Sequence, residues 1–285
     1  MQLQRFEKAE DFYAGAGRLL AQREAENCLM LGLVASLGRD PGLPPEEPYM
    51  ATVGEGGEAI AAALMTPPFG LVVSTVARGD PGEVLAPIVD DVRRFRVTPP
   101  GVVGPALVSR AFAELWQASE GQPYRKGTAM RVYRLRRVIP VTGVPGALRT
   151  ATDRDRELLS QWFAAFNREA LGEETNPEQA ERLTEAYLQG ETRGIYLWED
   201  GRPVSMAGHS GPTPNGVRVN AVYTPPGLRG RGYASACVAT LSQKLLDKGR
   251  RYCFLFTDLA NPTSNRIYRA VGYEAVADVD EYKFP

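Results

Sequence analysis

Apolar positions recur with the period of a β-strand in some segments of this chain and with that of an α-helix in others. Their succession predicts the order of strands and helices. The first half predicts a strand over 3–6, a helical region over 9–37, a hairpin over 46–65 turning at Gly56-Gly57, and a strand over 69–77. Helical periodicity then covers 83–95 and 105–119, with a brief strand at 101–103 between them, and residues 124–138 are expected to be extended.

The second half repeats this order of elements. It predicts a strand over 146–152, helices over 153–170 and 177–188, a hairpin formed by GIYLWE and PVSMAGHS, and a strand over 217–224. A helix over 233–248, a strand over 251–258, a helix from Pro262 and a last strand over 274–284 complete it. The two hairpins also share residues at one constant offset: Glu55, Gly57, Ile60 and Ala63 match Glu199, Gly201, Val204 and Ala207.

We interpret this repetition as the duplication of a whole domain, the alternative being two unrelated hairpins with the same turn chemistry. The Pro- and Gly-rich segment VIPVTGVPG, at 138–146, is where we expect the boundary. The predicted domains are therefore 1–140 and 146–285.

Composition narrows the classes of function. The formal net charge of -1 provides no overall attraction to nucleic acid or to an anionic membrane. The basic runs RRFR (93–96) and RVYRLRR (131–137) have no aromatic platform beside them, so we read them as solvated faces. The charged start MQLQRFEKAE is unlike a signal peptide, and no apolar run is long enough to span a membrane.

Three cysteines lie without CxxC spacing at Cys28, Cys237 and Cys253. Their odd number argues against a disulfide framework, and the spacing argues against a zinc site. We expect no metal and a cytoplasmic protein. The cysteines of the later helix and strand are expected to be buried, inert thiols rather than nucleophiles.

The segment VNAVYTPPGLRGRGYA, at 219–234, carries the first candidate chemistry. It starts as a strand and enters a helix through a loop containing Gly230 and Gly232, whose backbone can lie close to a ligand. The helix start presents unpaired N–H groups and the positive end of its dipole, and Arg229 and Arg231 add charge. This arrangement predicts a phosphate or pyrophosphate site. The alternative is an ordinary strand-turn-helix connection with surface arginines.

The segment NPTSNRIYRAVGY, at 261–273, carries the second group of candidate functional residues. Asn261 is suited to cap a helix that starts at Pro262 and ends at Gly272. Ser264 and Tyr268 are four residues apart and therefore share one face of that helix.

Together these two segments resemble the GNAT acyltransferases, over about the last half of the chain. The family's loop pattern, Arg/Gln-x-x-Gly-x-Gly/Ala, is met by Arg229, Gly232 and Ala234. Its helix pattern, Asn-x-x-Ser-x-x-x-Tyr-x-x-x-Gly-Phe/Tyr, is met by Asn261, Ser264, Tyr268, Gly272 and Tyr273. The resemblance implies an α/β (α+β) fold of two GNAT-like domains, each a mixed, mostly antiparallel sheet flanked by helices.

The resemblance also implies acetyl-CoA, or another acyl-CoA, as cosubstrate. Its pyrophosphate would lie on the loop residues Arg229, Gly230, Arg231, Gly232, Tyr233 and Ala234. The end of the preceding strand would splay from its neighbour, so that main-chain groups of Val222, Tyr223 and Thr224 bind the pantetheine arm and the thioester carbonyl. Tyr268 would be the general acid that protonates the leaving thiolate. Asn261 and Ser264 would either contact the pantetheine or ribose or only cap the helix.

The acceptor is expected to be the amine of a small molecule, and the general base stays open. Candidates are His209, Asp258, Glu173, Glu174 and the terminal carboxylate of Pro285, and an amine of lowered pKa could also lose its proton to water.

The first copy has RGDPGEV, at 78–84, where the loop should lie. Asp80 and Glu83 would repel a pyrophosphate. Ala113 stands four residues after Ser109, where the family has its tyrosine. We therefore expect a degenerate domain that walls the acceptor cleft or forms a homodimer interface. Two alternatives for the whole chain are an acyl-CoA-binding sensor without chemistry and an interaction scaffold.

Overall fold

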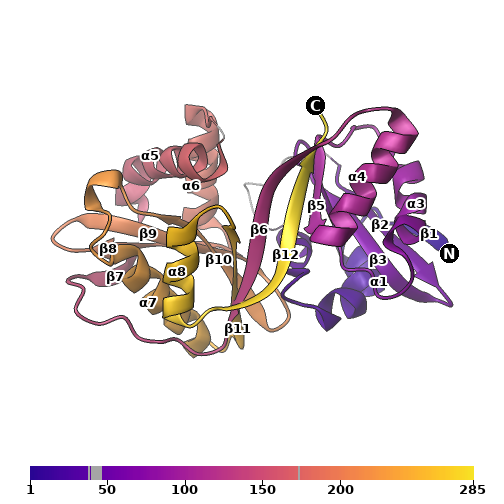
Figure 1. The fold of residues 1–285 in the computed structure, drawn as a ribbon. Coiled ribbons are helices and arrows are strands. Elements are labelled where there is room, and N and C mark those ends of the chain that lie inside the picture. Colours follow the sequence, from indigo (N-terminus) through magenta and orange to yellow (C-terminus); the bar gives the residue numbers. More distant parts are fainter. Residues whose placement is uncertain (38, 40–46, 173) are drawn as a thin grey trace.

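The computed structural model describes residues 1–37, 39, 47–172 and 174–285 (Figure 1). The start of the predicted hairpin at 46 and the candidate base Glu173 lie outside the described residues. The first half contains β1 (Gln2–Arg5), α1 (Ala9–Gln22), α2 (Cys28–Ser36), β2 (Tyr49–Glu55), β3 (Glu58–Met65), β4 (Leu71–Val73), α3 (Pro81–Val92), β5 (Gly101–Pro105), α4 (Ala106–Glu120) and β6 (Arg125–Leu135).

The second half repeats this order of helices and strands, with short 3-10 and π turns added. Its elements are β7 (Ala147–Thr150), η1 (Asp153–Asp155), α5 (Arg156–Phe166), η2 (Asn167–Leu171), α6 (Pro177–Gln189), β8 (Gly194–Glu199), β9 (Pro203–Pro212), β10 (Gly216–Tyr223), η3 (Pro226–Leu228), α7 (Tyr233–Asp247), β11 (Tyr252–Asp258), α8 (Pro262–Val271) and β12 (Glu274–Lys283). The helix expected over 153–170 starts as a 3-10 turn, η1, and ends as a π turn, η2.

Two predicted elements of the first half are wrong in extent. The helical region expected over 9–37 is broken between α1 and α2, where Asn27 is buried. Its amide donates to the Leu20 carbonyl and to Thr75 Oγ1, and its Oδ1 accepts from Thr75 N at 3.0 Å. The strand expected over 69–77 is only Leu71–Val73. Beyond β4 the regular ladder ends, although Ala77 N still donates to the Ile60 carbonyl of β3.

The twelve strands of the described residues form one continuous sheet, in which each half contributes its last strand to the other. The order is β1-β2-β3-β4-β5-β12-β6-β11-β10-β9-β8-β7. β6 pairs antiparallel with β11, and β12 pairs antiparallel with β5 and with β6. Figure 1 shows β6 and β12 side by side between the two groups of helices. The boundary at 138–146 remains a prediction, but the segments on its two sides do not close separate sheets.

Helices cover both faces of the sheet in each half, and α2 joins the halves. In the second half, α7 and α8 pack on one face, around Leu241 and Tyr268, and α5 and α6 on the other, around Phe163 and Tyr187. α2 of the first half lies on β9 of the second. A Cβ on Gly32 would stand 2.6 Å from Gly211 Cα, so the two backbones touch and fix this junction.

None of the described helices is both long and apolar enough to cross a lipid bilayer.

Candidate active site

The central strands of the second half separate, as expected for the strand before the loop. β10 and β11 run parallel and are in register only from Gly216 to Arg218. The register of β10 with β9 also shifts between Asn220 and Tyr223, and Ala221 between them has a φ of 48°. A positive φ is unusual for a residue with a Cβ and marks a local irregularity in the strand. The end of β10 therefore lies outside the β11 ladder.

The helix that follows has an open N-terminus. α7 begins after Gly232, whose φ of 82° is left-handed and which offers no side-chain cap. Gly230, two residues earlier, has a φ of 78°. The first N–H groups of a helix have no partner within it, and the helix dipole places partial positive charge there. The described geometry is therefore suited to receive an anion at this loop.

The side chain of Arg229 already has partners within the protein. Its Nε donates to the Thr224 carbonyl at 2.8 Å, its Nη2 forms an ion pair with Glu169, and its guanidinium lies over the Tyr223 ring. The hydrogen bond from Arg229 is the main reason why the pKa of Glu169 is lowered. The Tyr223 hydroxyl also donates to Glu169, at 3.2 Å. No sequence motif points to Glu169, which is far from Arg229 along the chain.

The other predicted loop residues divide between exposed and buried positions. Arg231 is exposed, and Ala234 is partly buried in the first turn of α7. Tyr233 is buried and its hydroxyl donates to Asp200 Oδ2 at 2.7 Å, a bond that raises the pKa of Tyr233. Tyr233 thus ties the start of α7 to the turn between β8 and β9.

Tyr268 is buried on α8, with 8% of its surface exposed. Burial raises its pKa to about 12. Its ring meets the Tyr273 ring edge-on, with the centroids 6.0 Å apart. Within the described part of the chain, its hydroxyl has no hydrogen-bond partner. The phenol is therefore neutral at ordinary pH and free to donate.

At the start of α8, the side chains mostly bind the backbone. Asn261 Oδ1 accepts from Ser264 N at 3.0 Å, which is a helix cap. The neighbouring Asn265, not singled out in the sequence, donates to the carbonyls of Asp258 and Asn261 and accepts from the Tyr133 hydroxyl. A buried amide with partners on β6 and β11 fixes α8 against both strands.

The candidate bases lie in different places. His209 is opposite Val219 in the register of β9 and β10, and the charges that reach it are those of Lys248 and Arg250. These residues follow the C-terminal end of α7, whereas the loop is at its N-terminal end. Burial is the main cause that lowers the pKa of His209 to about 4. His209 is therefore remote from the loop.

The remaining candidate bases are Asp258 and Glu174 in the second half and the terminal carboxylate of Pro285. Asp258 ends β11, and its Oδ1 accepts from Ala260 N at 2.8 Å. Glu174 is exposed. The Pro285 carbonyl accepts from Gln122 at 2.7 Å, so the chain ends against the first half, away from α8.

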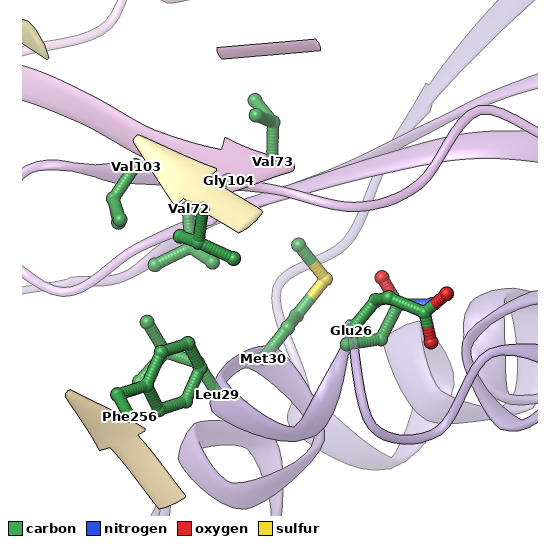
Figure 2. Close-up of a pocket in the computed structure, with 10 residues that line it drawn as sticks. Glu26, Leu29, Met30, Val72, Val73, Val103, Gly104 and Phe256 are labelled. Carbon is green, nitrogen blue, oxygen red and sulfur yellow. The ribbon is translucent and has the colours of Figure 1, made fainter. Parts of the chain in front are cut away.

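The equivalent site of the first half is closed. Asp80 Oδ1 accepts from Gly82 N at 2.9 Å and from Glu83 N at 3.2 Å, so a carboxylate already caps α3. At β4 and β5, Val72 and Val103 face Met30 and Phe256 across a cavity of about 10 Å³ (Figure 2). That volume holds about one water molecule.

No group of three or more His, Cys, Asp or Glu side chains that could hold a metal ion occurs in the part of the chain that the structure describes. All three cysteines are buried, and burial is the main cause that raises the pKa of each thiol. The cysteines therefore take no visible part in the site.

Comparisons with known proteins found similarity in sequence and in fold. Residues 156–273 match the model described as the acetyltransferase (GNAT) family. The comparison with curated proteins gave no match. A solved Drosophila protein superimposes with a TM-score of 0.71 at 12% identity, covering 99% of this chain and 98% of the other.

Two further structures carry the family in their names. A tandem GNAT protein from the clavulanic acid biosynthesis pathway has a TM-score of 0.61 at 14% identity, covering 99% of this chain and 97% of its own. A GCN5-related N-acetyltransferase from Kribbella flavida has a TM-score of 0.62 at 17% identity, covering 93% and 96%. Residues 156–273 of the second half therefore carry a GNAT-family domain, and the chain as a whole shares the fold of these structures, one of which is a tandem GNAT protein.

Proposed function

We propose that the second half binds acetyl-CoA, or another acyl-CoA, and transfers the acyl group to the amine of a small molecule. The observation that carries this proposal is the uncapped N-terminus of α7 beside the separating strands β10 and β11. The corresponding helix of the first half, α3, is capped by its own Asp80. An open helix start is available to a pyrophosphate, whereas a capped one is not.

The residues present fit this cosubstrate. Gly230 and Gly232 have no Cβ and both have a positive φ, so the backbone can approach an anion closely. Arg231 is exposed, and Arg229 has its guanidinium at the same loop. We assign the loop 229–234 to the pyrophosphate and Val222, Tyr223 and Thr224 to the pantetheine arm. Asn261 and Ser264 are assigned chiefly to the cap of α8.

When bound, the thioester supplies an activated acyl group and a thiolate leaving group. Tyr268 is the proposed general acid, because a phenol with a pKa of about 12 holds its proton at neutral pH. Acceptor deprotonation by His209 is not part of the proposal, because that residue lies at the other end of α7. Asp258 and Glu174 remain candidates for the base.

The experiment is thermal melting with and without acetyl-CoA, followed by assay of acetyl transfer to a panel of amines. At 100 times its dissociation constant, a ligand adds about 2.7 kcal/mol, or a shift of roughly 5–10 °C. Arg231→Glu should lose most of this shift, whereas Arg94→Glu, at an exposed position of the first half, should keep it. An unchanged melt of the wild type in acetyl-CoA would refute the proposal.

Binding without transfer would instead favour the sensor. Tyr268→Phe separates the two roles of the site: we expect acetyl-CoA to bind as before and turnover to fall about 100-fold or more, within the usual range for a lost general acid. If the variant turns over at the wild-type rate, Tyr268 has no acid role.

A further inference from the structure

Three arginines surround the ring of Tyr252 at the start of β11. Arg134 lies near the end of β6, Arg136 directly follows that strand, and Arg251 directly precedes β11. Their Cζ atoms lie 5.6, 5.6 and 5.4 Å from the centre of the ring. From the sequence alone, the basic run at 131–137 is expected to be a solvated face. The fold instead gathers two of its arginines with a third from a distant part of the chain.

Carboxylates do not neutralise this group, which we call the Tyr252 cluster. Among the described residues, none of its arginines forms an ion pair, and the Nε of Arg134 is buried without a hydrogen-bond partner. On β10, the Nε of Arg218 is also buried without a hydrogen-bond partner in the described structure. Arg218 and Arg134 both stand opposite Phe254, one on each side of it. A buried donor without a partner is costly, and like charges at short range add to that cost.

The acidic side chains near the cluster either contact other residues or form no ion pair with its arginines. Glu24, in the connection between α1 and α2, accepts from Thr213 Oγ1 and from Asn215. Glu26 pairs with Arg23. Glu274 of β12 stands opposite Arg134 in register but makes no ion pair with it in the described structure. None of these carboxylates forms an ion pair with an arginine of the cluster in the described structure, so the guanidinium donors are available to an added anion.

The Tyr252 cluster is separate from the proposed acyl-CoA loop. That loop precedes α7, and the cluster follows its other end, at the start of β11. A helix of 15 residues is about 22 Å long, so one anion cannot occupy both places.

We propose that the Tyr252 cluster binds a small phosphate-bearing anion of more than one charge. A guanidinium offers two parallel N–H donors that match phosphate oxygens, and stacking on an aromatic ring holds the fork in place. Because it holds three guanidinium groups, the cluster is better matched to a multiply charged ligand than to a single carboxylate.

The test is calorimetric titration of inorganic pyrophosphate at about 50 mM salt, where screening is weak. To remove binding at the acyl-CoA loop, all proteins carry Arg231→Glu. We expect the double variant Arg136→Ala/Arg251→Ala to bind at least tenfold more weakly, because each lost charge-assisted bond is worth about a factor of ten. Arg94→Ala should bind as the parent does. Both altered arginines of the double variant are exposed, so the fold should persist, as circular dichroism will verify.

Single Arg136→Lys and Arg251→Lys variants keep the charge but lose the fork, and each should weaken binding by a smaller factor. The proposal is overturned if the parent fails to bind pyrophosphate at about 10 mM, or if the double variant binds equally well. A short RNA that binds the parent far more tightly than pyrophosphate, and loses this in the double variant, would show a polymer site and also overturn it.

Discussion

The ion pair between Glu169 and Arg229 gives a sharp test of how the loop works. Glu169 accepts a charged hydrogen bond from the guanidinium that we assign to the pyrophosphate. A bound pyrophosphate and Glu169 would therefore compete for Arg229. Glu169→Gln removes the negative charge and keeps the size of the side chain and a hydrogen-bond acceptor for Tyr223. We predict that this variant binds acetyl-CoA more tightly.

The size of the effect follows from exposure. The side chains of Arg229 and Glu169 are 49% and 34% exposed, so water screens their interaction strongly. Exposed pairs of this kind contribute about 0.2–1 kcal/mol. If this energy no longer has to be given up on binding, the dissociation constant should fall by a factor of about 1.4–5.

The assay is calorimetric titration with acetyl-CoA at low and at high salt. The gain should shrink at high salt, because salt screens the pair in the free protein. Glu185→Gln is the matched control, since Glu185 pairs with Arg156 at similar exposures of 35% and 32%. We expect the control to leave affinity unchanged. Weaker binding by Glu169→Gln would mean that Glu169 positions Arg229 for the ligand, and the competition argument would be refuted.

Three further predictions concern stability. Gly232→Ala should lower the free energy of unfolding more than Gly230→Ala. Both variants place an alanine at a positive φ, which costs about 1–2 kcal/mol. Only the first also brings a Cβ to 2.8 Å from Val144 Cγ2. Urea unfolding measures both, and equal costs would exclude a role for that contact. Asp80→Ala should lower stability by about 0.5–2 kcal/mol through loss of the α3 cap, seen in the same assay, with no change in acetyl-CoA affinity. Burial raises the pKa of Tyr268 from 10.0 to about 12. The contribution of the neutral phenol to the free energy of unfolding is therefore complete below pH 10 and is lost as pH rises from 10 to 12. Melting curves over that range should fall more steeply for wild type than for Tyr268→Phe, and parallel curves would contradict this.

Local chemistry explains why many elements were predictable. α8 starts at Pro262 after Asn261 and ends before Gly272, because the cap, the proline and the left-handed glycine act within a few residues of one another. The splay of β10 was expected from the resemblance, and its register with β11 bears this out. The separate placement of His209 could not be predicted, because it depends on the register of β9 with β10.

Contacts between distant residues account for what the sequence did not predict. The break between α1 and α2 depends on hydrogen bonds between Asn27 and Thr75, and the state of Arg229 depends on Glu169. Periodicity specifies which face of a strand is apolar but not which strand lies beside it. The exchange of β6 and β12 is such a choice of partner, so a linear reading assigned each strand to its own half.

This exchange gives a structural reason for a first half whose own site is closed. β12 is the strand beside β5, and beyond it Phe284 packs against the rings of Phe112 and Trp116 in the core of the first half. In return, β6 of the first half lies beside β11, and its Tyr133 hydroxyl binds Asn265 at the base of the helix that carries Tyr268. The first half therefore supports the second half's site through the sheet, a role that requires β6 but not an open anion site of its own.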